Sequence, residues 1–403
     1  MVRDEGCASV RVVGRAGVDS ADRWQGGCVV KTLGSRAQGA RLERMKGSTQ
    51  WAGEGFRNVQ PILPGLRDPN AAMPSLTEFL LRTGGRRTPA RPLPSVDPRH
   101  IWGHRPDSGL RVTWLGHSTV LIEIDGVRLL TDPVWGARAS PLPLIGPRRF
   151  QPVPVALHAL PPIDAVVLSH DHYDHLDYPT IRALAKRTVP FVTSLGVGAH
   201  LEAWGIAPQR ITELDWWEQY TLPGSDVQVS AVPAQHFSGR IPKMRNSTLW
   251  SSFVVQSDQH TVFFSGDTGL TREYERVRAR FGPFDLVMLE IGGWHPAWGD
   301  MHLGPQHALT ACQLLGAQTW LPVHWGTFSL AMHAWDQPAE SVLAASPSGG
   351  ERLVMPRLGE PVEPQHASDR IDPWWRGADG PQPSAPRGSV RRRRSHAASW
   401  PLD

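Results

Sequence analysis

Four potential metal ligands lie within six residues of this chain, directly after a run of apolar residues. The run Ile163–Ser169 is typical of a buried strand, and the chain continues with His-Asp-His-Tyr-Asp-His. A loop that leaves a strand can direct His170 and His172 at one ion, and Asp174 and His175 at a second. Neutral imidazoles and a carboxylate in this arrangement suit zinc, with iron or manganese as alternatives. An ordinary polar surface loop is the other interpretation, and suitable residues further along the chain argue against it.

Three further candidate ligands each follow a predicted strand. They are His236 after VQVSAVPAQ, Asp267 after TVFFSG and His324 after TWLPV. A single histidine at a strand end is usually an ordinary hydrogen-bonded residue, but the carboxyl ends of strands are where layered α/β proteins gather their sites. Seven ligands make two ions chemically sensible, with Asp267 as a carboxylate that bridges them.

Short β-branched and aliphatic runs alternate with helical patterns in the middle of the chain. Asp125-Gly126 joins two of these runs and is typical of a two-residue hairpin turn. The predicted strands are 111–116, 119–124, 127–132, 163–169, 190–194, 227–232, 251–256, 261–266 and 284–291. The predicted helices are 179–187, 271–281 and 305–317. Runs of strands followed by alternating strands and helices predict a layered α/β (α+β) protein.

The two ends of the chain show no core-forming pattern. Residues 1–50 lack a sustained period of about 2 or about 3.6 residues, so we expect them to be disordered, with Met45 as an alternative start. Residues 363–403 contain a Pro/Ser-rich stretch and four consecutive arginines, and they are expected to form a disordered tail. The folded domain is therefore predicted over 51–362.

The formal charge of +4 does not identify a partner, because the basic residues are concentrated in the ends. These ends carry sixteen Lys or Arg against ten Asp or Glu, which leaves the middle at about −2. Three widely spaced cysteines provide neither a disulfide framework nor a thiolate metal site. No apolar run reaches the roughly 18 residues of a membrane span, and the first residues lack a signal-peptide pattern. A cytoplasmic protein is the expectation.

The seven candidate ligands together resemble the signature of the metallo-β-lactamase superfamily. The likeness is closer to the branch that contains N-acylphosphatidylethanolamine-hydrolysing phospholipase D and its bacterial relatives. Motifs that resemble this branch are WLGHST (114–119), ELDWWE (213–218) and HWGTF (324–328). The resemblance extends from about Phe56 to about Pro338.

This resemblance implies an αββα sandwich, in which two mixed β-sheets pack together, helices lie outside and two zinc ions lie at one edge. The implied ligands are His170, His172 and His236 for one ion and Asp174, His175 and His324 for the other, with Asp267 between them. His302 in GDMHLGP matches a histidine that the family places near the substrate phosphate, and a surface-loop histidine is the alternative. Asp174 and His302 are therefore the predicted catalytic residues.

Other residues beside the predicted ligands have less specific roles. His117 and Asp171 are expected to orient the ligands, with a structural role as the alternative for His117. Trp294 and Trp298 are expected either to form an apolar rim that binds substrate or to fill the core. The segment Gly293–Asp300 resembles bacterial relatives more than the animal lipase, which leaves the lipid substrate open.

The predicted function is a dinuclear metal-dependent hydrolase, most specifically a phosphodiesterase acting on a phospholipid of the N-acylethanolamine type. Two ions can activate water and stabilise both oxygens of an in-line displacement. A lactone or ester hydrolase of the same fold is the main alternative. Nucleic-acid processing, indicated only by the arginine run, and non-catalytic metal binding are weaker alternatives. A small-molecule or phospholipid substrate, a peripheral membrane contact and a homodimer are further expectations.

Overall fold

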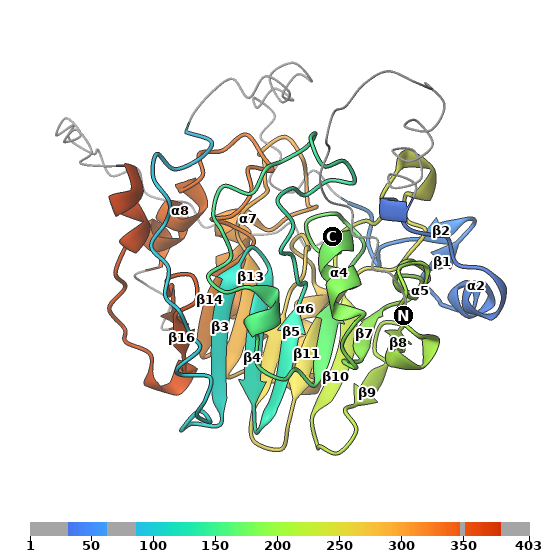
Figure 1. Ribbon diagram of the computed structural model, residues 1–403, viewed down its shortest axis with the longest axis horizontal. Coiled ribbons are helices and arrows are strands. Elements are labelled where there is room, and N and C mark those ends of the chain that lie inside the picture. The colour runs from blue at the N-terminus through green and yellow to red at the C-terminus, as the bar shows by residue number, and fades with distance from the viewer. Residues whose placement is uncertain (1–30, 63–85, 347–350, 380–403) are drawn as a thin grey trace, which may run out of the picture.

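Two seven-stranded sheets lie face to face at the centre of the computed structural model, which describes residues 31–62, 86–346 and 351–379 (Figure 1). The strands of the first sheet are β3 (Leu110–Gly116), β4 (Thr119–Ile124), β5 (Val127–Thr131), β6 (Ala165–Leu168), β7 (Phe191–Ser194), β8 (Ile211–Leu214) and β16 (Pro361–Val362). The strands of the second are β9 (Gln219–Thr221), β10 (Gln228–Pro233), β11 (Ser251–Gln256), β12 (Thr261–Phe264), β13 (Leu286–Glu290), β14 (Thr319–Val323) and β15 (Arg352–Leu353).

The two sheets have the same pattern of strand pairing. The order is β16-β3-β4-β5-β6-β7-β8 in the first sheet and β15-β14-β13-β12-β11-β10-β9 in the second. Each sheet has three antiparallel pairings on one side and three parallel pairings on the other. The two sheets therefore share one pairing pattern, although β16 of the first sheet comes from the C-terminal end of the domain and no repeat is evident in the amino-acid sequence.

Helices cover the outer face of each sheet. The helices on the first sheet are α4 (Tyr178–Leu184) and α5 (Gly198–Ala203), and those on the second are α6 (Glu273–Phe281), α7 (Gly304–Leu315) and α8 (Gln337–Ala345). Ile181 and Leu184 of α4 pack against Val166 and Phe191 of the first sheet. The predicted αββα sandwich is confirmed. No helix in the described part of the chain is long and apolar enough to cross a membrane.

Apolar side chains from both sheets fill the space between them. Val112 and Ile122 of the first sheet belong to one buried cluster with Val229 and Phe253 of the second. Each such side chain contributes roughly 1.5–3 kcal/mol by its removal from water. Because helices cover the outer faces, many strands are buried on both sides and appear in the sequence as continuous apolar runs. All nine predicted strands are present for this reason, with ends that differ by up to two residues.

The N-terminal prediction of disorder is wrong for residues 31–50. They include helix α2 (Gly39–Lys46), and the hairpin of β1 (Trp51–Ala52) and β2 (Gly55–Phe56) follows. Met45 is the one residue of α2 that is buried, and it packs beside Leu195 and Trp216. A helix that contributes a single side chain to the core leaves no periodic pattern, so the sequence did not reveal it. Residues 1–30 lie outside the described residues.

The predicted C-terminal tail also begins too early. Trp374 and Trp375 are buried in the core cluster shared by the two sheets, and Nε1 of Trp375 donates to Oε1 of Glu340 over 2.6 Å. Their burial depends on distant partners such as Trp325, whose ring lies 5.8 Å from that of Trp374. The folded domain therefore includes residues on both sides of the predicted 51–362 range. The arginine run lies outside the described residues.

Candidate metal centre

The predicted ligands come together at one end of the two sheets, beyond the ends of β6, β10, β12 and β14. They form two adjoining groups of side chains, and within each group the candidate ligand atoms lie within 4.8 Å of one another. The groups are His170, His172, His236 and Asp267, and His117, Asp174, His175 and His324. We call them the first and the second half-site. This division of the predicted ligands matches the one that the resemblance implies, except that His117 joins the second half-site.

Three imidazole nitrogens and a carboxylate oxygen converge in the first half-site. Nδ1 of His172 lies 2.8 Å from Nε2 of His170 and 3.3 Å from Nε2 of His236. Oδ2 of Asp267 lies 3.8 Å from Nε2 of both His170 and His236. This is the nitrogen-rich donor set that zinc and related divalent ions prefer.

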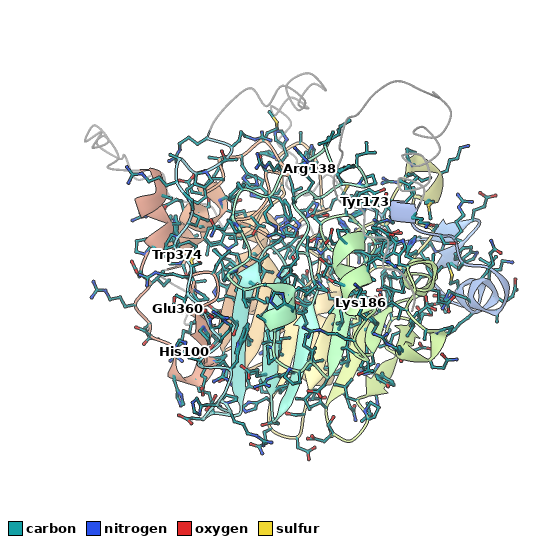
Figure 2. The ribbon with its side chains drawn as sticks, viewed as in Figure 1. His100, Arg138, Tyr173, Lys186, Glu360 and Trp374 are labelled. Carbon is teal, nitrogen blue, oxygen red and sulfur yellow. The ribbon has the colours of Figure 1, made fainter. Side chains whose placement is uncertain are left out.

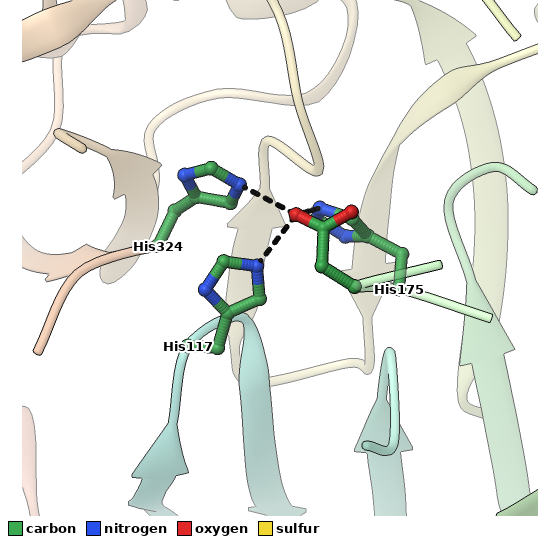
Figure 3. Close-up of side chains that lie close together, drawn as sticks. His117, His175 and His324 are labelled. Carbon is green, nitrogen blue, oxygen red and sulfur yellow. Dashed lines mark hydrogen bonds and ion pairs between the residues drawn. The ribbon is translucent and has the colours of Figure 1, made fainter. Parts of the chain in front are cut away.

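The second half-site contains the Asp174 carboxylate, and Asp267 of the first half-site also reaches it. Oδ2 of Asp174 lies 3.5 Å from Nε2 of His175 and 3.3 Å from Nε2 of His324 (Figure 3). Oδ1 of Asp267 lies 3.1 Å from the same atom of His175 and 3.2 Å from that of His324. Asp267 therefore directs one oxygen toward each half-site, which is the geometry of a bridging ligand.

Buried polar atoms without partners show that the second half-site fits a cation. Nε2 of His175, Nε2 of His324 and Oδ1 of Asp267 are buried and have no hydrogen-bond partner. Unpaired buried polar atoms are costly, and three of them facing one another are explained by a cation that they all bind. The donor set of both half-sites thus fits two divalent transition-metal ions.

The charges of the second half-site also favour a cation. Burial raises the pKa of Asp174 and of Asp267, but the surrounding histidines outweigh it and hold both well below the usual range. Conversely, burial lowers the pKa of His324, and the carboxylates of Asp267 and Asp174 outweigh it to give a pKa of about 10. The pKa of His175 is raised by the same carboxylates. Without a metal ion, protons on these two histidines balance the carboxylates.

Comparison with known proteins places this fold and site in a family. Residues 127–325 match the family model described as the Beta-lactamase superfamily domain. An uncharacterised protein of Mycobacterium tuberculosis is 44% identical over 325 residues, which are 80% of this chain and 86% of that protein. This chain belongs to the metallo-β-lactamase superfamily. Within that superfamily it is a metal-dependent hydrolase by its relatives and its donor set.

Relatives with a named activity include a phospholipase. The N-acyl-phosphatidylethanolamine-hydrolyzing phospholipase D 1 of Caenorhabditis elegans is 36% identical over 234 residues, which are 56% of this chain and 66% of that enzyme. Among solved structures, a possible metal-dependent hydrolase from Veillonella parvula has a TM-score of 0.51 at 16% identity, covering 62% of this chain and 98% of that chain. The structural likeness shows a shared fold.

Two residues that support the candidate ligands were not predicted from the sequence. Asp132 follows β5 and accepts from Nδ1 of His175 over 2.7 Å, and Asn58 binds the backbone of His236 through both its Oδ1 and Nδ2 atoms. Nδ1 of His236 donates to the carbonyl of Met301 over 2.8 Å. Each contact leaves Nε2 of its histidine directed at the metal centre. Asp132 could have been found, since it ends a strand as the ligands do.

His117 and Asp171 differ from one another in what they contact. Nε2 of His117 donates to Oδ2 of Asp174 over 3.0 Å, and the His117 carbonyl accepts from the backbone N–H of His324. His117 and His324 both have positive φ angles, 53° and 63°, a rare conformation that collects at functional sites. Asp171 instead bonds His200 and the N–H of Gly239, so it can act on the ligands through the loop that carries them and not through a direct hydrogen bond to an imidazole.

His302 lies between the two half-sites. Its ring lies 4.9 Å from that of His236 and 5.6 Å from that of His324. Nδ1 donates to Oε2 of Glu290 over 2.7 Å, and the other oxygen of Glu290 accepts from the N–H groups of Thr268 and Leu303. The sequence interpretation missed Glu290, which ends β13 and fixes the His302 ring. A surface-loop histidine would not have this buried partner.

The contacts of Trp294 and Trp298 bear less directly on their predicted role in a substrate rim. Trp294 is half-buried and packs over Gly304, where an added Cβ would approach its ring to 2.8 Å, and its ring stacks 6.0 Å from that of His333. The ring of Trp298 lies 5.7 Å from that of His295. Their role as a substrate rim stays a prediction. Phe237 was missed, and its ring lies 4.7 Å from those of both His172 and His236.

Proposed function

We propose that this protein is a dinuclear zinc phosphodiesterase that hydrolyses phospholipids. The observation that carries the proposal is the position of His302, which a buried carboxylate holds beside both half-sites. A named phospholipase at 36% identity supports the substrate class. When bound, two divalent ions supply Lewis acidity and activate water for attack on a phosphodiester.

The residues of the chain have distinct parts in this reaction. His170, His172 and His236 would hold one ion, and His175, His324 and Asp174 would hold the other, with Asp267 placed between the two half-sites. Asp174 is the more accessible carboxylate, with 14% of its side chain exposed against 2% for Asp267. Because His117 donates to Asp174 and the neighbouring histidines keep it charged, Asp174 can accept a hydrogen bond from water and orient it. Burial lowers the pKa of His302, but the Glu290 carboxylate outweighs it and raises the pKa. The protonated ring donates from Nδ1 to Glu290 and keeps a proton on Nε2, which it can donate to a phosphoryl oxygen.

A phospholipid substrate requires contact with a bilayer, and the loop 138–148 is suited to it. Leu144 and Ile145 at its tip are 82% and 65% exposed. The guanidinium of Arg138 donates to the carbonyls of Pro143 and Gly146, which holds the tip from inside. Burying two such side chains in a membrane interface is favourable, whereas exposing them to water is costly.

This loop lies at the same end of the molecule as the metal centre. Figure 2 shows Arg138 and Tyr173 above the same end of the sheets. Tyr173 belongs to the loop 169–175, which carries four of the candidate ligands and which we call the metal loop. Ala139, at the base of the loop, packs with Phe328, whose ring lies 5.3 Å from that of His117. A bilayer contacted by the tip would therefore lie near the metal centre, and we propose peripheral membrane binding through this loop.

A substrate panel tests the proposed function. Zinc-loaded protein is assayed on vesicles containing N-acylated phosphatidylethanolamine, on a soluble aryl phosphodiester and on a lactone. We expect turnover of the phospholipid, and a double Leu144→Ser, Ile145→Ser variant should lose activity on vesicles while retaining it on the soluble diester. Rapid lactone opening with no phosphodiester turnover would replace the proposal with the lactonase alternative.

A further inference from the structure

We propose that an N-terminal strap, residues 31–46, positions the first half-site through His200, and so sets how tightly that half-site holds its metal ion. The strap lies far from the metal loop in sequence but is bonded to α5, on which His200 lies. This inference rests on the proposed metal binding and does not depend on the substrate. It assigns a role to a segment whose sequence has no recognisable motif.

The strap determines which nitrogen of His200 carries a proton. The backbone N–H of Ser35 donates to Nδ1 of His200 over 3.0 Å. Nδ1 is therefore an acceptor, and the ring N–H lies on Nε2. Gly34 allows this approach, because it has a φ of 82° and an added Cβ would lie 2.1 Å from Nδ1. The close contact between strap and ring thus requires glycine at this position.

His200 passes this constraint to the metal loop. Nε2 of His200 lies 3.3 Å from Oδ2 of Asp171, and neither side chain is exposed. The other oxygen of Asp171 accepts from the N–H of Gly239 over 2.7 Å. Asp171 is the residue between His170 and His172, so its side chain anchors the middle of the loop that carries two ligands of the first half-site.

Arg240 makes a second connection between strap and metal loop. One Nη donates to the carbonyl of Thr32 in the strap, and the other donates to the carbonyl of Asp171. Arg240 is 4% exposed, so these bonds are shielded from water. The backbone and the side chain of Asp171 are therefore each held by a group that also contacts the strap.

Salt bridges fasten the strap to its side of the domain. Arg41 donates to Glu202 of α5 and to Glu213, over 2.8 and 2.6 Å. Oε1 of Glu213 in turn accepts from the N–H groups of Gly196 and Gly198, at the start of α5. Arg41, α5 and the strap thus form one connected unit, which keeps His200 in place.

The consequence concerns the spacing of two ligands. Nε2 of His170 and Nδ1 of His172 lie 2.8 Å apart on either side of Asp171 in the chain. A shift of Asp171 changes the distance and angle between these nitrogens, whereas His175 of the second half-site is oriented by Asp132. Contacts that orient metal ligands commonly change metal affinity by about 10- to 100-fold. The strap should therefore act on one half-site and not on the other.

Zinc affinity of His200 variants tests the proposal. In full-length protein, His200→Phe removes both ring nitrogens, and we expect one of two zinc equivalents to be lost to a competing chelator about 10- to 100-fold more readily. The second equivalent should be held as in wild type. His200→Gln can still accept from Ser35 and donate to Asp171, so it should restore most of the affinity. His158→Gln, an exposed histidine on η1 (Leu157–Ala159), is the matched control.

Further measurements separate positioning from simple structural support. Gly34→Ala leaves His200 intact but pushes its ring, and it should weaken the same zinc equivalent even if His200→Phe folds poorly. The melting temperature of each metal-free variant reports structural damage by itself. Equal weakening of both equivalents, or unchanged zinc affinity in Gly34→Ala and His200→Phe, would overturn the proposal. Because zinc binding is measured without substrate, failure of the phospholipase proposal would leave this result interpretable.

Discussion

Nδ1 of His175 donates to Oδ2 of Asp132 over 2.7 Å, and neither side chain is exposed to solvent. The N–H and the hydroxyl of Ser169 donate to the same carboxylate. Asp132 therefore ties the end of β5 to the beginning and the end of the metal loop. With Nδ1 occupied, Nε2 of His175 can only face Asp174 and Asp267, which is the orientation that a ligand of the second half-site needs.

Asp132→Asn should weaken zinc binding in the second half-site by about 10- to 100-fold. The amide presents an N–H group to a site surrounded by donors, so either His175 or Ser169 loses its acceptor. Chelator competition measures the effect, and the exposed Asp258→Asn provides a carboxylate-to-amide control. Wild-type affinity in Asp132→Asn would show that ring orientation does not depend on this carboxylate.

The purified protein should contain close to two equivalents of zinc or another divalent transition metal per chain. His172→Ala should reduce the metal of the first half-site, and Asp174→Ala that of the second, because each removes a ligand atom. Both variants should lose hydrolytic activity. Metal analysis of each variant beside its activity checks this, and full activity of metal-free protein would rule out the metal mechanism.

The two half-sites should respond differently to pH. Burial and neighbouring histidines lower the pKa of His170, and burial lowers the pKa values of His172 and His236. These ligands are therefore neutral near pH 7, and zinc does not have to displace a proton from them. The pKa of His324 is raised to about 10 and that of His175 is also raised, so zinc must displace their protons. Affinity in the second half-site should therefore fall as pH falls, by up to about tenfold per pH unit for each displaced proton.

Zinc competition at pH 6, 7 and 8 measures these two affinities, and calorimetry in buffers of different ionisation enthalpy counts the released protons. The first half-site acts as the internal control, since its affinity should change little over this range. Equal pH dependence of both zinc equivalents would contradict the assignment of protons to His175 and His324.

The sequence predicted which side chains gather at this end of the sheets, because each lies in a loop that follows a strand with a recognisable apolar run. Asp132 directly follows β5 and Glu290 is the last residue of β13, and the same rule applied to carboxylates would have found them. His200 and Asn58 carry no such signal. Their roles depend on contacts between segments that are far apart in the chain, such as the bond from Ser35 to His200, and these arise only on folding.

The errors at the ends of the domain have a related cause. Local patterns identify elements that bury a whole face, whereas α2 buries only Met45 and the C-terminal segment buries a tryptophan pair. Trp374 and Trp375 are stabilised by the distant Trp325 and Glu340. Without knowledge of these partners, Pro-rich and charged surroundings favoured an interpretation as disorder.

Trp375→Ala should destabilise the protein by about 3–5 kcal/mol, as expected for the loss of a large buried aromatic side chain. Trp375 is fully buried, and its removal also leaves Oε1 of Glu340 without this donor. Denaturant unfolding measures the change. Arg370→Ala, an exposed residue of the same segment, should change stability by no more than about 0.5 kcal/mol. A neutral Trp375→Ala would show that the segment adds nothing to the core.

His302 allows the substrate to be tested separately from the metal centre. His302→Ala should reduce phosphodiester turnover by about 10²-fold or more, because a donor to the phosphoryl oxygen is lost. Zinc content should stay at the wild-type level, since Nδ1 of His302 is bonded to Glu290 and the seven ligands are intact. The nearby His295→Ala is the matched control and should retain activity.

The effect of His302→Ala should depend on the electrophile. A lactone has no phosphoryl oxygen for Nε2 of His302 to bind, so any lactone turnover should fall much less than phosphodiester turnover. Parallel kcat and KM measurements on both substrates, with zinc analysis of the same samples, give the comparison. If phosphodiester turnover is unchanged, His302 has no part in binding the phosphate and the phosphodiesterase proposal loses its main structural support. If zinc is lost as well, His302 is itself a ligand, because it lies with Asp267, Glu290 and His324 in a third possible ligand group.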